Sequence, residues 1–164
     1  VQPNIVTYTA LIHGAANAHD LPKADKLLLD ARESGLKMDV VIYNAAINAH
    51  ASQGYVESAE HLLEEMLCSH VKADRVTHNT LIKACARSQS WQRALSLFGK
   101  MVDANVALDQ ASIKVFESAV GKHRCTTMCS ALGVDVQKLP GQGYGRPSHG
   151  DVIRTARALN PRYR

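Results

Sequence analysis

Cys125, Cys129 and His123 are the residues of this 164-residue chain that come closest to forming a metal site. The two thiols stand four residues apart, about one turn of a helix, and one imidazole lies near them. A structural zinc ion takes four such ligands, and no second pair with a suitable spacing follows. We therefore interpret Cys125 and Cys129 as small packing residues, and we expect neither a bound metal nor another cofactor.

The run Gly141-Gln142-Gly143-Tyr144-Gly145 resembles a phosphate-binding loop only in composition. It follows no predicted strand and lacks the Gly-Lys-Ser/Thr ending of such loops. The eight His residues are scattered, with no Ser or carboxylate placed for nucleophilic or acid–base chemistry. The sequence predicts no catalytic residue, no enzyme activity and no small-molecule substrate. Residues 140–150, with four Gly and two Pro, are predicted to form a linker.

The overall composition excludes several classes of protein. With 46% hydrophobic and 21% charged residues, no uninterrupted apolar run approaches the roughly 18 residues of a membrane span. A 5% aromatic content, with Trp91 as the one tryptophan, is too low for an aromatic base-stacking surface. Four irregularly spaced Cys residues do not suit a secreted disulfide scaffold and favour a reducing interior. We expect any targeting segment to lie outside this sequence.

The net charge of +4 is concentrated at the carboxyl end. Residues 1–142 carry 14 basic and 14 acidic side chains, whereas residues 143–164 hold five Arg against Asp151. Ser148 and Asp151 have the spacing of a capping box, which predicts a short helix in the segment 151–164. This basic segment is either simply solvated or docked on RNA phosphates or an acidic protein surface. Its arginines are Arg146, Arg154, Arg157, Arg162 and Arg164.

The sequence repeats itself every 35 residues, with copies starting at Ile5, Val40 and Arg75. A period of this length indicates a repeat architecture, with units 5–39, 40–74 and 75–109 and with residues 1–4 as the end of a preceding unit. A shift of one residue destroys the agreement. Six positions are identical in all copies: Val6/Val41/Val76, Ile12/Ile47/Ile82, Ala16/Ala51/Ala86, Ala24/Ala59/Ala94, Leu27/Leu62/Leu97 and Asp39/Asp74/Asp109.

Each copy contains two apolar stripes with the spacing of one helix face. Since one helix pair cannot bury its apolar faces alone, the copies must stack, and we predict an all-α, right-handed α-solenoid with an extended concave face. The first stripe holds Tyr8, Leu11, Ile12, Ala15, then Tyr43, Ala46, Ile47, then His78, Leu81, Ile82, Cys85; the second holds Ala24, Leu27, Leu28, Ala31, then Ala59, Leu62, Leu63, Met66, then Ala94, Leu97, Phe98, Met101.

Short breaks separate the predicted helices at residues 19–20, 53–54 and 88–90. Asp20 and Ser90 are candidate N-caps of the second helices. Gly35, His70 and Asn105 follow these helices, and Gly and Asn tolerate the left-handed backbone that often ends a helix.

Tetratricopeptide repeats also pair two helices, but they have a period of 34 and a Trp-x-x-Leu-Gly signature that is absent here. The segments Ile5-Val6-Thr7-Tyr8-Thr9, Val40-Val41-Ile42-Tyr43-Asn44 and Arg75-Val76-Thr77-His78-Asn79, each closing its 35-residue unit with Asp, resemble the pentatricopeptide repeat family. The resemblance covers about residues 1–109. It implies a non-catalytic RNA-binding solenoid of a mitochondrion or chloroplast, acting in RNA processing, stability or translation.

The first helix of each copy presents short polar residues beside its apolar stripe, so a stacked array displays one polar set per repeat. Repeat proteins that read single-stranded RNA engage one base per repeat through two or three side chains. The resemblance implies that the fifth and last residues of each repeat form a base-reading pair, with the first pair favouring G and the other two U. These pairs are Thr9 with Asp39, Asn44 with Asp74, and Asn79 with Asp109; Val6, Val41 and Val76 would sandwich the bases.

A structural interpretation of the same residues stays open. Each Asp could cap the next first helix, and each Val could pack between copies. Phosphate contacts supply much of nucleic-acid affinity and need Lys or Arg. The Lys that the resemblance implies near the end of the first helix is replaced by Asn17 and Ser52, and cations remain in the third repeat at Arg87 and Lys83.

Three repeats would contact about three bases, and at roughly 1–3 kcal/mol of discrimination per good contact they cannot specify one site in a transcriptome. Either the repeats belong to a longer array, or the solenoid is a scaffold or structural subunit of an organellar complex such as a ribosome. The expected partners are therefore single-stranded or structured organellar RNA and the protein subunits of a larger assembly.

Residues 110–139 continue the register only in part. Ile113, Phe116 and Val120 favour a further first helix over 112–120, but Lys114 stands at the base-reading position and Glu117 where Ile is otherwise found. We predict a capping or degenerate fourth repeat, completed by a short helix over 124–132, because a solenoid end needs a polar outer face.

Overall fold

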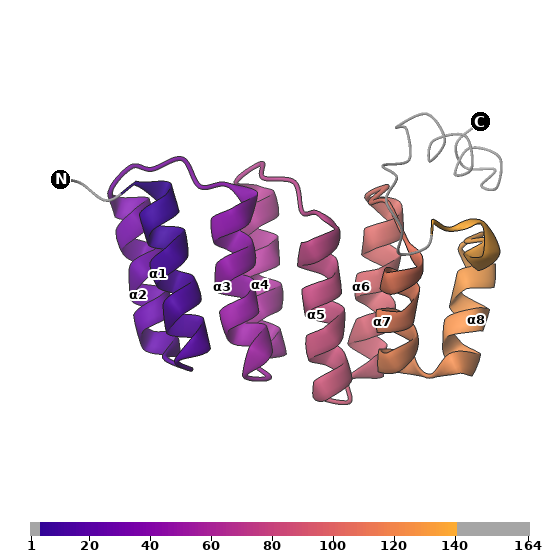
Figure 1. The fold of residues 1–164 in the computed structure, drawn as a ribbon. Coiled ribbons are helices and arrows are strands. Elements are labelled where there is room, and N and C mark those ends of the chain that lie inside the picture. The colour runs from indigo at the N-terminus through magenta and orange to yellow at the C-terminus, as the bar shows by residue number, and fades with distance from the viewer. Residues whose placement is uncertain (1–3, 141–164) are drawn as a thin grey trace.

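The computed structural model describes residues 4–140, which form helices and no strand (Figure 1). The all-α solenoid prediction is confirmed, and the predicted linker and basic segment beyond residue 140 lie outside the described residues. The first helices of successive pairs begin at residues 5, 40, 75 and 110. The elements are α1 (Ile5–Asn17), α2 (Leu21–Glu33), α3 (Val40–Ser52), α4 (Val56–Cys68), α5 (Arg75–Arg87), α6 (Trp91–Asp103), α7 (Gln110–Val120), α8 (Lys122–Ala131) and the 3-10 helix η1 (Val136–Lys138).

The helices form two layers. The first helices α1, α3, α5 and α7 pack on one another in succession. The second helices α2, α4 and α6 each pack against their own first helix and the next one, and α8 packs against α7. Long charged side chains join the second helices: Arg32 of α2 pairs with Glu65 of α4, and Arg93 of α6 pairs with Glu57 and Glu60 of α4. Among the described residues, no two second helices pack on one another to a comparable extent, so the closest contacts of the stack are those between the first helices. We call their solvent-exposed side the inner face.

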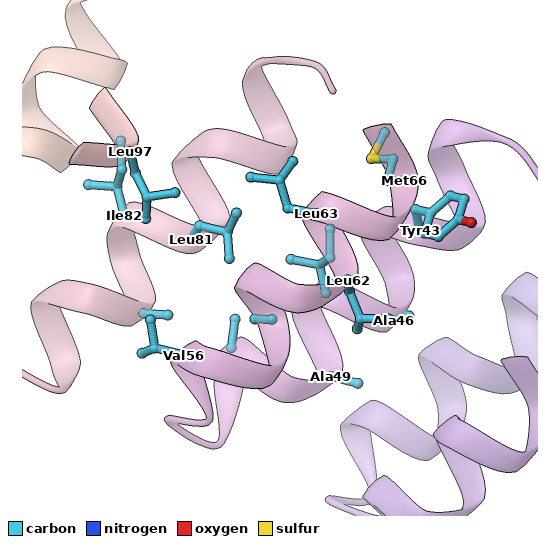
Figure 2. Close-up of a cluster of buried hydrophobic side chains, with 14 of the residues drawn as sticks. Tyr43, Ala46, Ala49, Val56, Leu62, Leu63, Met66, Leu81, Ile82 and Leu97 are labelled. Atoms are coloured by element: carbon cyan, nitrogen blue, oxygen red, sulfur yellow. The ribbon is translucent and has the colours of Figure 1, made fainter. Parts of the chain in front are cut away.

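The predicted stripes form the core. Figure 2 shows Tyr43, Leu62, Leu63 and Met66 packed between α3 and α4, with Leu81, Ile82 and Leu97 from the next repeat nearby. Ile12, Ile47 and Ile82, identical in all three repeats, are fully buried.

Leu11 departs from the predicted stripe because its side chain is 45% exposed. Its equivalents, Ala46 of α3 and Leu81 of α5, are buried because the preceding first helix covers that side of each helix. Among residues 4–140, no helix covers the corresponding side of α1.

The turns after the second helices adopt the left-handed backbone expected of them. Gly35, His70 and Asn105 have φ values of 69°, 58° and 54°. Asp20 caps α2 as predicted, because its carboxylate accepts a hydrogen bond from the Lys23 amide at 3.1 Å. Ser90 occupies the N-cap position of α6 but makes no cap hydrogen bond there, since its hydroxyl is engaged with that of Ser88 at 3.1 Å.

The fourth helix pair, α7 and α8, continues the stack. The rings of Phe98 and Phe116 stack with centroids 4.0 Å apart and join α6 to α7. Both helices begin two residues before their predicted starts, because Asp109 caps α7 and Gly121, with φ 85°, permits the turn into α8.

Cys125 and Cys129 of α8 are buried, as the packing interpretation predicts. Burial raises the pKa of the Cys125 thiol to about 12, and burial also raises the pKa of Cys129, so both thiols stay protonated at neutral pH. Over the part of the chain that the structure describes, no three His, Cys, Asp or Glu side chains gather as a metal site would require. Within the same residues, every helix is too short or too polar to cross a bilayer.

One buried position changes in the third repeat. Tyr8 and Tyr43 place their hydroxyls beside those of Ser34 and Ser69 at 3.4 and 3.1 Å, but the third repeat has His78 at this position.

The His78 ring is buried, with its Nδ1 unpaired among the described residues. Burial lowers the pKa of His78; the negative charge of Asp74 opposes this decrease and the positive charge of Lys100 adds to it. The ring is therefore neutral in the folded protein at pH 7.

We expect this buried ring to make stability depend on pH. Because the pKa of His78 is lower in the folded chain than its ordinary value of 6.5, the unfolded chain binds more protons as the pH falls below 6.5. The free energy of unfolding should then fall by up to about 1.4 kcal/mol per pH unit. Urea denaturation at pH 7.5 and 5.5 should show a smaller loss in His78→Tyr, which carries the residue of the first two repeats. Equal losses in both proteins would contradict the prediction.

Candidate functional site

A row of exposed valines runs along the inner face. Val6, Val41 and Val76, each the second residue of its first helix, are 70%, 52% and 57% exposed. The interpretation that they pack between copies is therefore wrong. One exposed apolar side chain needs no explanation, but the same residue exposed at the same position of three successive repeats forms a regular apolar row.

The last residue of each repeat caps the next first helix. Oδ1 of Asp39 accepts hydrogen bonds from the Val41 and Ile42 amides, both at 3.0 Å. Oδ1 of Asp74 accepts from the Thr77 amide at 2.9 Å, and Oδ1 of Asp109 accepts from the Ser112 amide at 2.7 Å. The capping interpretation is thus confirmed. It does not exclude ligand binding, because every cap bond goes to the same oxygen and Oδ2 takes no part in it.

The structure brings the predicted pair of the second repeat into direct contact. Asn44 Nδ2 donates to Asp74 Oδ1 at 3.2 Å. Thr77 lies beside both residues, and its hydroxyl is 2.6 Å from Asn44 Oδ1 and 2.9 Å from Asp74 Oδ1. Burial opposes ionisation of Asp74, but the hydrogen bonds from Thr77 and Asn44 outweigh it and lower the pKa of this carboxyl. The pair is therefore an amide fixed beside a carboxylate.

The pair of the third repeat is joined indirectly. Asn79 Nδ2 donates to the Ser112 hydroxyl at 3.2 Å, and that hydroxyl donates to Asp109 Oδ1 at 2.9 Å. Asn79 Oδ1 is buried and has no hydrogen-bond partner among the described residues. The amide thus contacts Ser112 and leaves the carboxylate of Asp109 to other groups.

The pair of the first repeat is not joined. The Thr9 hydroxyl donates to the Ile5 carbonyl oxygen in its own helix at 2.8 Å. Ile42, which has no hydroxyl, stands where Thr77 and Ser112 stand in the later repeats. Within the described residues, no hydrogen bond links Thr9 to Asp39.

Thr77 and Ser112 also belong to the site, although the pairing of fifth and last residues expected from the sequence did not include them. Both are almost completely buried, although their hydroxyls are polar. The signal that reveals them is a hydroxyl three residues after the capping Asp, because the third residue of a helix can return a hydrogen bond to its cap. Asp74 and Thr77 form such a reciprocal capping box.

Cations lie on one half of the inner face. Lys83 and Arg87 are exposed on α5, and Lys114 and Lys122 are exposed where Asn79 and Arg87 stand one repeat earlier. These four residues form what we call the basic patch. The positions that correspond to Lys83 and Arg87 in the first two repeats hold His13 and Asn17, then Asn48 and Ser52. The inner face is therefore uncharged along α1 and α3 apart from the Asp residues, and basic along α5, α7 and the start of α8. The five tail arginines lie outside the described residues.

Three family models match successive parts of the chain. A pentatricopeptide repeat domain matches residues 1–49, the PPR repeat family matches residues 38–87, and a PPR repeat matches residues 76–106. The chain belongs to the pentatricopeptide repeat family. A search of curated protein sequences finds no match.

Solved structures of pentatricopeptide repeat proteins have the same fold. PPR10 in complex with an 18-nt psaJ RNA element has a TM-score of 0.70 and 26% sequence identity, over 80% of this chain and 20% of that one. PPR10 from maize has a TM-score of 0.71 and 18% identity, over 96% and 22% of the two chains. PRORP2, a nuclear proteinaceous RNase P from A. thaliana, has a TM-score of 0.69 and 10% identity, over 96% and 35%. The last two similarities show the fold alone, and the chain spans about a fifth of the PPR10 chain.

The role of Thr77 can be tested by an isosteric change. Thr77→Val removes the hydroxyl that joins Asn44 to Asp74 and should lower the free energy of unfolding by about 1 kcal/mol. The matched control is Thr7→Val at the equivalent position of the first repeat, where the exposed hydroxyl donates to Asn4 Oδ1 at 3.1 Å and bridges no reading pair among residues 4–140. Urea denaturation should show less than half the loss in the control. Equal losses would contradict the linking role of Thr77.

Proposed function

We propose that the inner face binds single-stranded RNA without catalysis, one base per repeat. The observation that carries the proposal is the repeated combination of an exposed Val with a short polar pair at each junction between first helices. Membership of the pentatricopeptide repeat family supports it, as does the likeness to PPR10, whose crystal structure contains an RNA element. Family membership also implies action in a mitochondrion or chloroplast, in RNA processing, stability or translation.

The second repeat has the chemistry that uracil requires. Asn44 uses one amide hydrogen on Asp74 and keeps a second for a base, because a side-chain amide carries two donors. Asp74 uses Oδ1 for its cap and keeps Oδ2 as an acceptor. The Watson–Crick edge of uracil presents one N–H donor between two carbonyl acceptors. We place the Asp74 carboxylate opposite the ring nitrogen, where it would accept from the N–H of uracil while the Asn44 amide donates to a carbonyl. The ring nitrogen of cytosine is itself an acceptor, so it would be repelled by the carboxylate at that position.

The junctions between α1 and α3 and between α3 and α5 would select bases, while the basic patch would bind the phosphates of the RNA backbone. Lys83, Arg87, Lys114 and Lys122 are exposed on the inner face of the third and fourth units. Phosphate contacts carry affinity and little sequence information. In this arrangement Val41 and Val76 flank the base that Asn44 and Asp74 read, and Val6 and Val41 flank the preceding base.

Base reading can be tested at the second repeat. Fluorescence anisotropy at physiological salt should show that the chain binds a short RNA with a central GUU roughly tenfold more tightly than one with GCU, because one good base contact supplies discrimination of this order. Asn44→Ala should remove most of this ratio. Asn48→Ala, one turn further along α3 and exposed, should leave it unchanged. Equal affinities for the two RNAs in the parent protein would contradict base reading.

The role of the basic patch can be tested through salt dependence. Each phosphate contact to a single strand contributes about 0.7 to the slope of log affinity against log salt concentration. The double variant Lys83→Gln/Arg87→Gln should therefore reduce the slope by about 1.4. The control Lys23→Gln/Lys26→Gln removes two exposed lysines from α2 in the other layer and should change it little. Equal slopes for both double variants would place the phosphate contacts elsewhere.

A further inference from the structure

An ion pair distinguishes the third reading pair from the second, although both consist of Asn and Asp. Nη1 of Arg75 lies 2.6 Å from Oδ2 of Asp109. The residues equivalent to Arg75 are Ile5 in the first repeat and Val40 in the second. Among the described residues, the hydrogen bonds of Asp39 and Asp74 use Oδ1, whereas Asp109 has both oxygens engaged.

The ion pair changes the groups that the third repeat offers to a base. The Asp109 side chain is 18% exposed, and its second oxygen is occupied by the guanidinium. The Arg75 side chain is 47% exposed, and the donors that it does not use on Asp109 are available to solvent or ligand. Where the second repeat offers a carboxylate acceptor, the third therefore offers donors.

The amide of the third pair does not compensate for the occupied carboxylate. Asn79 donates to Ser112, and it makes no direct contact with Asp109. A base N–H would also have to displace a charged donor from Asp109, and hydrogen bonds between two ionised groups are stronger than those from a neutral donor. Uracil therefore loses its acceptor in this repeat.

We propose that Arg75 is the specificity-determining residue of the third repeat. Its ion pair withholds the Asp109 carboxylate from the RNA, so this repeat does not select uracil even though its fifth and last residues match those of the second repeat. The inference rests on the proposed function. It replaces the implied preference for G-U-U by a preference for G-U followed by any base.

The test compares four RNAs that differ only in the base after G-U. The parent protein should bind all four within about twofold. Arg75→Val, which supplies the residue that Val40 supplies in the second repeat, should prefer uracil at the third base by roughly tenfold. Arg75→Lys keeps the charge and the possibility of pairing with Asp109, and it should remain unselective. Because each readout is a ratio between RNAs, a uniform loss of affinity from the removed charge cancels.

The reciprocal variant Val40→Arg places a guanidinium at the corresponding position beside Asp74. It should abolish the preference for uracil over cytosine at the second base, with circular dichroism melting as the check of its fold, since Val40 is half-buried. The Arg75→Val result stands alone if Val40→Arg does not fold.

The outcomes separate this proposal from the function on which it rests. Selection of uracil at the second base, with a third base that stays unselective in Arg75→Val, would overturn the role of Arg75 alone. A parent protein that already selects uracil equally at both bases would do the same. No selection at the second base in the parent protein would overturn base reading and this proposal together.

Discussion

The hydrogen bond between the last residue of one repeat and the first turn of the next is the interaction on which the inner face depends. The first amides of a helix have no partner within the helix, and Asp39, Asp74 and Asp109 supply one at the start of α3, α5 and α7. Such a cap contributes about 1 kcal/mol. It also fixes the carboxylate by one oxygen, so the other oxygen is positioned before any ligand arrives. A contact that is ordered in advance costs less entropy when it forms.

The repeat period and most of the core could be predicted from the sequence, because the buried positions recur at the same place in every 35-residue repeat. Ile12, Ile47 and Ile82 are identical and all buried, and the capping Asp residues stand directly before the helices that they start. Leu11 was wrongly expected in the core, because its burial depends on a neighbour covering α1 and the local pattern does not encode that neighbour. The spacing of apolar residues predicts which face of a helix is apolar. Whether another helix packs on that face depends on the tertiary structure.

The reading pairs likewise could be located from the sequence, but their hydrogen-bond partners could not. A rule that compares the fifth and last residues gives Asn44/Asp74 and Asn79/Asp109 the same meaning. The structure separates them through residues outside the rule. In one pair the Thr77 hydroxyl bridges Asn44 and Asp74, which also contact each other directly. In the other pair, Arg75 engages the carboxylate of Asp109. These partners lie far from at least one pair member in sequence, so only the stacking of α3, α5 and α7 brings them together.

The layer of first helices sets the distance between reading positions, and small side chains make that distance short. Ala45, Ala46 and Ala49 of α3 are almost completely buried, on the helix that packs directly on α1. Larger residues there would separate the two helices, because a packed interface has little free volume to absorb them. The second helices tolerate a wider spacing, since Arg32 and Arg93 span it with long charged side chains. The two layers thus differ in the side chains that fill them, with short buried alanines where α3 packs on α1 and long arginine–glutamate pairs between the second helices, and this difference lets the first helices pack more closely than the second helices do.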